Sequence, residues 1–217
     1  MNTAFLPVRR RRLRKRLHTI SAESDEAILG RYQQTRRRED FAQLVYRYER
    51  ELFNYLRRYL GDAESAEDVF QSTFLQVHLN CEQFQADRRF RPWLYCIATN
   101  QAIDLQRKNR RYKALSLDRT TENEEADLGS LLSLLAGNTP SPIKLVGDAE
   151  QAQWVREALQ RLPEPFRAVV HLAYYQGMTY VEVAEALSIP VGTVRSRLHS
   201  AVAKLHDMWN TQFRDSP

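Results

Sequence analysis

The sequence has little glycine and proline, 7 and 8 residues respectively among 217. Both residues interrupt helices, so their scarcity and the abundance of Leu, Ala, Glu, Arg and Gln favour helices over sheets. No run of about 18 apolar residues is present, and no apolar stretch of signal-peptide length follows the N-terminal arginines. We therefore expect an all-α chain that has no membrane span and stays in the cytoplasm.

Cysteine is also rare, with only Cys81 and Cys96 in the sequence. Their spacing fits neither a CxxC pair nor a zinc-binding pattern, and both lie in apolar, helix-like sequence, where reduced cysteine is the default. The sequence also lacks a Walker loop and a dinucleotide fingerprint. We expect no metal, no cofactor and no enzymatic activity. A nucleic-acid enzyme is the weaker alternative, because its candidate metal ligands, Glu67, Asp68 and Asp104, lie on different predicted helices.

Positive charge is unevenly distributed along the chain, whose net charge is +5. Seven of the residues 9–16 are Arg or Lys, whereas residues 114–150 contain two basic and seven acidic side chains. Clustered Lys and Arg favour a polyanionic partner, because binding releases condensed counterions. A solvated charged surface is the alternative interpretation.

Composition and periodicity divide the chain into four segments. In the second and fourth segments apolar residues recur at three- and four-residue steps, as from Phe41 to Tyr59, which predicts amphipathic helices. We expect flexibility in the third, acidic segment, and disorder in the first apart from a short helix near residues 23–34. The segments are a basic extension (1–37), a first helical domain (38–113), a linker (114–149) and a second helical domain (150–210).

The strongest local signal is a helix-turn-helix pattern over residues 179–205. Thr179 and Glu182 form a capping box, Pro190 breaks the first helix, and a basic second helix follows. In this motif the second helix enters the DNA major groove, where Arg binds guanine and Ser or Thr binds bases or phosphates. An ordinary helical hairpin is the alternative. The predicted DNA-facing residues are Thr193, Arg195, Ser196, Arg197, His199 and Ser200.

A second candidate site lies over residues 84–111, where an aromatic cluster precedes a basic helix end. Aromatic faces stack on unpaired bases, and neighbouring cations hold the backbone. The alternative is that the aromatics form core and the cations suit a helix C-terminus. The candidates are Phe84, Phe90, Trp93, Tyr95, Asn100, Arg107 and Lys108. On the preceding helix the polar pair Asp68 and Gln71 is a candidate docking surface.

These motifs together resemble the extracytoplasmic-function sigma factors of RNA polymerase. Residues 191–200 (VGTVRSRLHS) are similar to the family's recognition helix, and 162–167 (LPEPFR) and 177–184 (GMTYVEVA) to the sequence before it. Residues 67–74 (EDVFQSTF) resemble its polymerase-docking helix. Residues 90–104 (FRPWLYCIATNQAID) resemble its promoter-melting segment.

The resemblance implies two small helical domains, a region 2 bundle of three or four helices and a region 4 helix-turn-helix. It implies promoter DNA and core RNA polymerase as partners. Asp68, Gln71 and Phe74 would contact the clamp coiled coil of the largest subunit, and the flap of the second-largest subunit is a further contact. Regulation by an anti-sigma factor is common in the family, although no residue here identifies one.

The resemblance also implies roles at the promoter. Phe84 and Asn100 would hold a base flipped from the −10 element beside the basic Arg107 and Lys108, while Trp93 and Tyr95 would mainly support the fold. Arg195, Ser196, His199 and Ser200 would face the −35 element, with Thr193 and Arg197 nearer phosphates.

The sequence departs from the family pattern at two places that bear on DNA contacts. Ser200 stands where relatives often have Arg, and Arg88 and Arg89 stand where small or acidic residues are frequent. A stand-alone helix-turn-helix regulator that dimerises through its first half is the alternative function.

Overall fold

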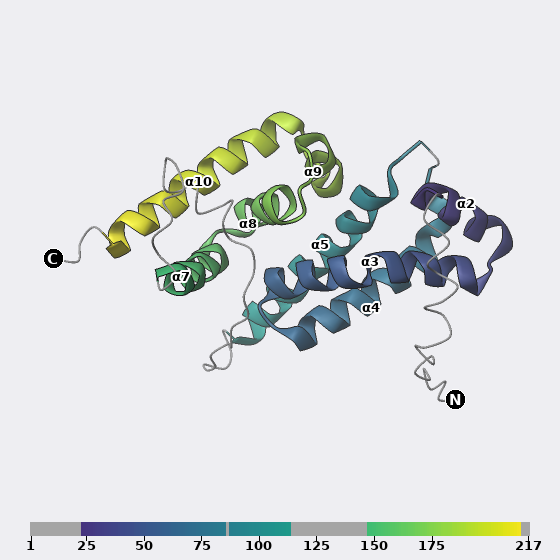
Figure 1. Cartoon of the computed structure of the whole chain (residues 1–217), viewed down its shortest axis with the longest axis horizontal. Coiled ribbons are helices and arrows are strands. Elements are labelled where there is room, and N and C mark those ends of the chain that lie inside the picture. The colour runs from purple at the N-terminus through teal and green to yellow at the C-terminus, as the bar shows by residue number, and fades with distance from the viewer. Residues whose placement is uncertain (1–22, 86, 114–146, 214–217) are drawn as a thin grey trace.

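The computed structural model of the chain describes residues 23–85, 87–113 and 147–213. Every regular element among these residues is a helix, so the predicted all-α class is confirmed for the part of the chain described. The helices form two groups, one from each half of the sequence (Figure 1). The Arg-rich run at 9–16 and residues 114–146 of the predicted linker lie outside the described residues.

The first group is a helical bundle whose core lies between its three longest helices. Its elements are α2 (Asp25–Thr35), α3 (Arg38–Leu60), α4 (Ala63–Asn80), the 3₁₀ turn η1 (Cys81–Gln83) and α5 (Phe90–Lys113). Helix α3 buries Leu44, Leu52 and Leu56 completely, as its apolar periodicity predicts. It ends at Gly61, whose φ of 93° favours glycine. The Asp62 carboxylate then caps α4.

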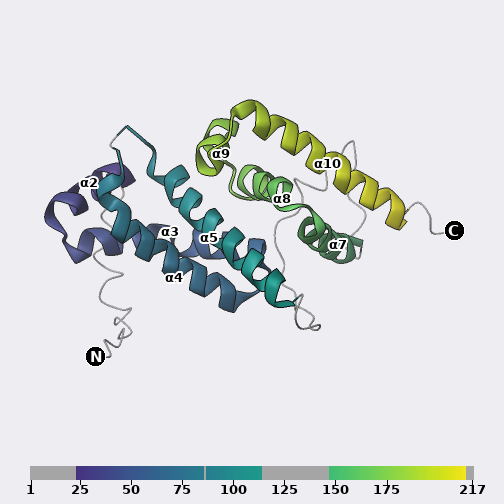
Figure 2. The same cartoon turned by 180° about the vertical axis from the view of Figure 1, so that it is seen from behind.

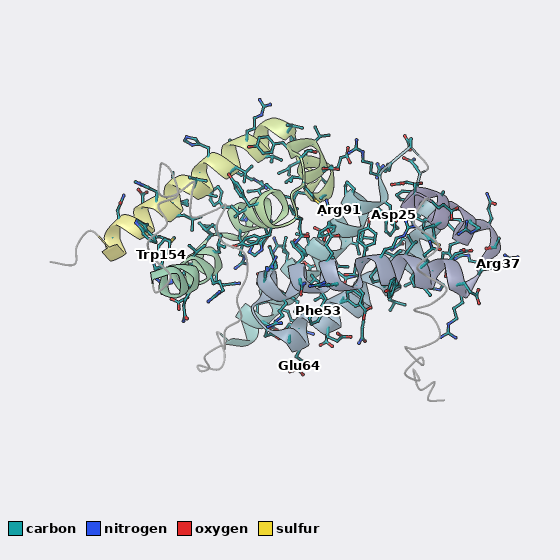
Figure 3. All side chains as sticks on the ribbon, viewed as in Figure 1. Asp25, Arg37, Phe53, Glu64, Arg91 and Trp154 are labelled. Carbon is teal, nitrogen blue, oxygen red and sulfur yellow. The ribbon has the colours of Figure 1, made fainter. Side chains whose placement is uncertain are left out.

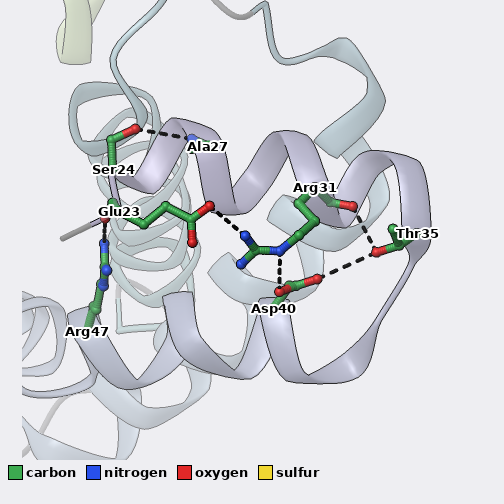
Figure 4. A network of polar contacts seen from close by, with 7 residues as sticks. All are labelled: Glu23, Ser24, Ala27, Arg31, Thr35, Asp40 and Arg47. Atoms are coloured by element: carbon green, nitrogen blue, oxygen red, sulfur yellow. Dashed lines mark hydrogen bonds and ion pairs between the residues drawn. The ribbon is translucent and has the colours of Figure 1, made fainter. Parts of the chain in front are cut away.

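Helix α2 lies where the sequence predicts a short helix, near residues 23–34, and it packs on this bundle. Ile28 and Leu29 are fully buried, and Tyr32 hydrogen-bonds to His78 Nδ1 of α4 at 2.6 Å. Arg31 lies between α2 and α3, 2.7 Å from Asp40 Oδ1, and also pairs with Glu23 (Figure 4). Buried apolar groups and these ion pairs therefore fix α2 to α3.

In the second group the shorter helices pack on one long helix, which is the last of the chain. Its elements are α7 (Gly147–Arg161), α8 (Glu164–Val170), the π-helical turn η2 (His171–Tyr175), α9 (Tyr180–Leu187) and α10 (Val191–Phe213). Helix α10 packs on α8 and α9, and buries Val194, Leu198 and Leu205. Trp154 of α7 meets Trp209 of α10 edge to face, with ring centroids 4.9 Å apart. Aromatic packing therefore closes the end of this group.

The two groups lie side by side, with α9 against α5 in both views (Figures 1 and 2). Helix α5 thus packs on the bundle with one face and on the second group with another. No helix that the structure describes has the length and apolarity needed to cross a membrane.

Replacing Leu29 with Ala should lower the free energy of unfolding by about 2–5 kcal/mol, because the change leaves a cavity under α2. Gln34→Ala is the matched control on the same helix, since Gln34 is exposed, and it should change stability by less than about 0.5 kcal/mol. Urea unfolding measures both. Equal stability of the two variants would show that α2 is not part of the bundle.

Candidate nucleic-acid interface

Helices α9 and α10 form the helix-turn-helix that the sequence predicts. The Thr179 hydroxyl accepts from Glu182 N at 3.3 Å, and Glu182 Oε2 accepts from Thr179 N at 2.9 Å, which completes the capping box. The Thr179 N–H bond lowers the pKa of Glu182, so the carboxylate stays ionised at the helix N-terminus. Ser188 turns the chain with a φ of 52°, and Ile189 N donates to Ala184 O at 3.0 Å. These bonds fix the angle between the helices.

The outer face of α10 presents the polar side chains predicted to meet DNA. Arg195, Ser196 and His199 are exposed, while Thr193, Arg197 and Ser200 are half-buried. Val194 and Leu198, which alternate with them, face the core. The helix therefore offers hydrogen-bond donors to a groove while its other face holds the domain together.

A hollow of about 590 Å³ runs beside this face and adds residues that the sequence analysis did not single out. Tyr174 and Tyr180 line one side, and Arg195 and His199 line the other. Tyr180 and its neighbour Val181 are large exposed side chains in the first turn of α9. The sequence could have pointed to both residues, because they occupy the first turn of the first helix of the motif. That turn lies near the DNA backbone in helix-turn-helix proteins.

The outer face of α4 carries two of the three residues of the candidate docking surface. Asp68 and Gln71 are exposed, but Phe74 is only 5 % exposed and packs into the bundle with Phe70 and Phe41. Leu75 and Leu79 stand on the exposed face instead, at 55 % and 60 %. Exposed leucines one turn apart form an apolar patch beside the polar pair.

The aromatic residues around the start of α5 mostly form core. The Phe84 ring centroid lies 5.0 Å from that of Trp93 and 6.3 Å from that of Phe90. Phe84 and Phe90 are buried, whereas Trp93 is half-buried. Of these three described residues, Trp93 is the one that is partly exposed.

Tyr95 is fully buried where α5 meets the second group. Its hydroxyl oxygen lies 2.9 Å from Glu51 Oε1 and 2.8 Å from Gln176 Oε1. Burial and the Glu51 carboxylate raise the pKa of this hydroxyl, so it remains a donor. Arg91 donates to Gln176 O at 2.7 Å and pairs with Glu51, at the junction seen in Figure 3. Tyr95 thus joins the bundle to the second group of helices.

The remaining candidates on α5 are exposed. Asn100 donates to the Cys96 sulfur at 3.6 Å, and the Cys96 thiol is in hydrogen-bonding contact with the Ser188 side chain. Arg107 pairs with Glu164 Oε1 at 2.9 Å, and Lys108 is exposed beside it. Residues from both halves therefore surround the promoter-melting candidates of α5.

The rings of His171, Tyr59 and Tyr175 pack together where the two groups of helices meet, and we call them the aromatic joint. The His171 ring is fully buried against Tyr59 and stacks on Tyr175, with centroids 5.3 Å and 5.1 Å away. Neither ring nitrogen has a hydrogen-bond partner among the described residues. Burial, and to a smaller extent Arg167 and Arg58, lower the pKa of His171 to about 3. The joint therefore holds a neutral imidazole.

Two family profiles match the two halves of the chain. Residues 44–112 match the profile described as Sigma-70 region 2, and residues 152–205 match Sigma-70, region 4. Similar proteins include the ECF RNA polymerase sigma factor SigW of Bacillus subtilis, 32% identical over 73% of this chain and 83% of SigW. The ECF RNA polymerase sigma-E factor of Escherichia coli is 31% identical over 82% and 90%.

Solved structures share the fold. CnrH, solved in complex with the cytosolic domain of CnrY, matches 87% of this chain and 99% of its own at a TM-score of 0.62 and 23% identity. The sigma factor RpoE of Bartonella quintana, solved with the anti-sigma factor NepR, matches 79% and 98% at a TM-score of 0.59 and 19% identity.

Regions 2 and 4 on one helical chain define a sigma factor of the sigma-70 class. The chain belongs to the family of extracytoplasmic-function (ECF) RNA polymerase sigma factors. It directs transcription initiation and is not an enzyme. Membership in this family excludes the alternative function, a stand-alone helix-turn-helix regulator.

His171 should make the stability of the chain fall in mild acid. Its pKa is about 3 in the folded chain and 6.5 ordinarily, so the unfolded chain binds the proton first. The stabilisation is complete above pH 6.5 and is lost as pH falls toward 3, by about 1.4 kcal/mol per pH unit. Urea unfolding between pH 7.5 and 5 measures the slope. His171→Phe should flatten it, and an unchanged slope in that variant would contradict the assignment.

Proposed function

We propose that this sigma factor docks on core RNA polymerase through the outer face of α4. The polar pair Asp68 and Gln71 and the apolar pair Leu75 and Leu79 lie on one exposed face, and the two leucines are 55% and 60% exposed. Exposed apolar side chains rimmed by polar groups are typical of protein–protein contacts. Buried Phe74 shapes this face from beneath by packing on Phe70. The clamp coiled coil of the largest subunit is the proposed partner.

Helix α10 is the proposed reader of the −35 element. Its exposed Arg195, Ser196 and His199 would enter the major groove, with Ser200, Thr193 and Arg197 at the edges. Tyr180, at the start of α9, would lie against the DNA backbone. The single observation that carries the function is this exposed polar face on a capped helix-turn-helix, joined in one chain to a region 2 bundle.

The start and middle of α5 form the proposed −10 site. Asn100 would bond to the edge of an unpaired base, and the half-buried Trp93 ring, supported by Phe84, would offer a stacking surface. Arg107 and Lys108 would hold the strand. Flipping a base costs a few kcal/mol, and stacking returns about 1–3 kcal/mol per base, so the cationic contacts are needed as well.

Two further partners are proposed for the chain. The flap of the second-largest polymerase subunit would hold region 4 near the −35 element. An anti-sigma factor would regulate the chain, a proposal supported by the RpoE structure of similar fold, which contains the anti-sigma factor NepR.

Arg195→Ala should weaken binding of the holoenzyme to promoters by about 1–3 kcal/mol when the −35 element is present, because a groove contact is lost. Arg161→Ala removes the same charge from a side chain that is 70% exposed on α7, and it should leave binding unchanged. Electrophoretic mobility shifts with and without the −35 element measure the difference. An equal loss for both variants, or for core binding, would argue against base reading by Arg195.

Leu75→Ala combined with Leu79→Ala should lower affinity for core polymerase about tenfold, equivalent to about 1.4 kcal/mol. Thermal stability should hardly change, because both side chains are exposed. Tyr46→Ala on α3 is the control, since Tyr46 is similarly exposed at 49%. Fluorescence anisotropy with labelled chain measures core affinity. Unchanged affinity of the double variant would exclude this face as the docking surface.

A further inference from the structure

Three consecutive arginines form the turn between α2 and α3, where Figure 3 labels Arg37. Arg36 follows α2 with a φ of 52°, Arg37 precedes α3, and Arg38 is the first residue of α3. All three side chains are exposed. The turn therefore presents three positive charges in succession.

The three arginines differ in their surroundings. The Arg36 guanidinium pairs with Glu82 of η1 and donates to the Cys81 sulfur at 3.1 Å, so it fastens the turn to η1. Arg37 and Arg38 have no ion pair or side-chain hydrogen bond with any of the described residues. We call these two residues the basic corner, and their guanidinium groups are open to a partner.

Local helix stability does not account for the basic corner. The Arg37 side chain makes no capping hydrogen bond to α3. The start of a helix carries partial positive charge, so cations are disfavoured there. Glu39 and Asp40 follow in the first turn, but Asp40 already pairs with Arg31 at 2.7 Å. A polyanion bound at this turn would stabilise the two arginines, because their charges would then be matched.

The basic corner lies next to the proposed −10 site. Gln33, in the last turn of α2, donates to the carbonyl oxygens of Cys81 at 2.6 Å and Phe84 at 3.1 Å. The Phe84 ring packs on Trp93 of α5. Arg37 is four residues beyond Gln33, at most about 14 Å of chain. A strand held against Trp93 can therefore reach the basic corner within a few nucleotides.

Another cation lies between the base-capturing residues and the basic corner along the chain. Arg88, in the loop between η1 and α5, is exposed and interacts electrostatically with Cys96, one helical turn before Asn100. Lys108 is exposed toward the other end of α5. Cations are thus present on both sides of the residues proposed to capture a base. A cationic track beside a stacking surface is typical of sites that bind single strands through their backbone.

We propose that the basic corner binds the phosphate backbone of the single DNA strand that continues from the −10 element toward the transcription start. The proposal rests on the −10 site assigned above to α5. The −35 side of the promoter stays duplex, so the unpaired strand leaves Asn100 and Trp93 in the other direction. Arg37 and Arg38 would bind two phosphates further along that strand.

Promoter templates with a single-stranded end test the basic corner in the full chain bound to core polymerase. In one template the non-template strand stops directly after the −10 element, and in the other it continues for about ten nucleotides. Arg37→Ala combined with Arg38→Ala is the test variant. Arg50→Ala combined with Arg161→Ala removes the same charge from two exposed side chains and is the control. Arg37→Lys combined with Arg38→Lys retains the charge.

The Ala variant should bind the short template as wild type does and the extended template at least about threefold more weakly, because two phosphate contacts are lost. On the extended template its slope of log affinity against log salt should be smaller by about 1.4, at about 0.7 per phosphate. The Lys variant and the control should match wild type on both templates, since Lys also binds phosphate as a point charge. Mobility-shift titrations at several salt concentrations measure all of these values.

The two templates separate failure of this proposal from failure of the −10 site. Equal affinity of wild type and the Ala variant for the extended template would overturn the proposal alone. So would a loss that is the same on both templates, or one that is equally large in the control or the Lys variant. If wild type binds the short template equally well with and without the −10 sequence, the −10 site fails, and the proposal that rests on it fails too.

Discussion

Helix α5 packs on the bundle and also on the second group of helices, and the rest of the structure depends on this double packing. One face of the helix completes the bundle through Phe90, Leu94 and Ala98, all fully buried. Another face meets α9. The residues proposed to capture a base are on the same helix, so it must hold a core together and expose side chains to single-stranded DNA. Both demands are met in this structure, because Asn100 and Lys108 are exposed while Phe90, Leu94 and Ala98 are buried.

Region 2 gains its stability from more than the helices that the apolar periodicity identified. Helix α2 adds fully buried Ile28 and Leu29, and the Glu26 carboxylate accepts from Phe90 N at 2.8 Å, at the start of α5. A carboxylate suits that position because a helix N-terminus carries partial positive charge. The first helix thereby positions the beginning of α5.

Periodicity could predict the helices because each hides one apolar stripe, as α3 does from Leu44 to Tyr59. It could not orient α4, whose apolar residues occur on both faces, so it distinguished neither the buried Phe74 nor the exposed Leu79. The sequence indicated the short helix near residues 23–34, but not its packing on the bundle through Ile28 and Leu29. Contacts such as Arg107 with Glu164 join residues 57 positions apart, and no local pattern pairs them.

The contact between the two groups of helices combines ion pairs at its rim with a buried aromatic centre. Its rim pairs are exposed, as Arg89 is at 68%, and such pairs contribute at most about 1 kcal/mol each. Most of the stabilisation therefore comes from the joint at His171 and Arg167.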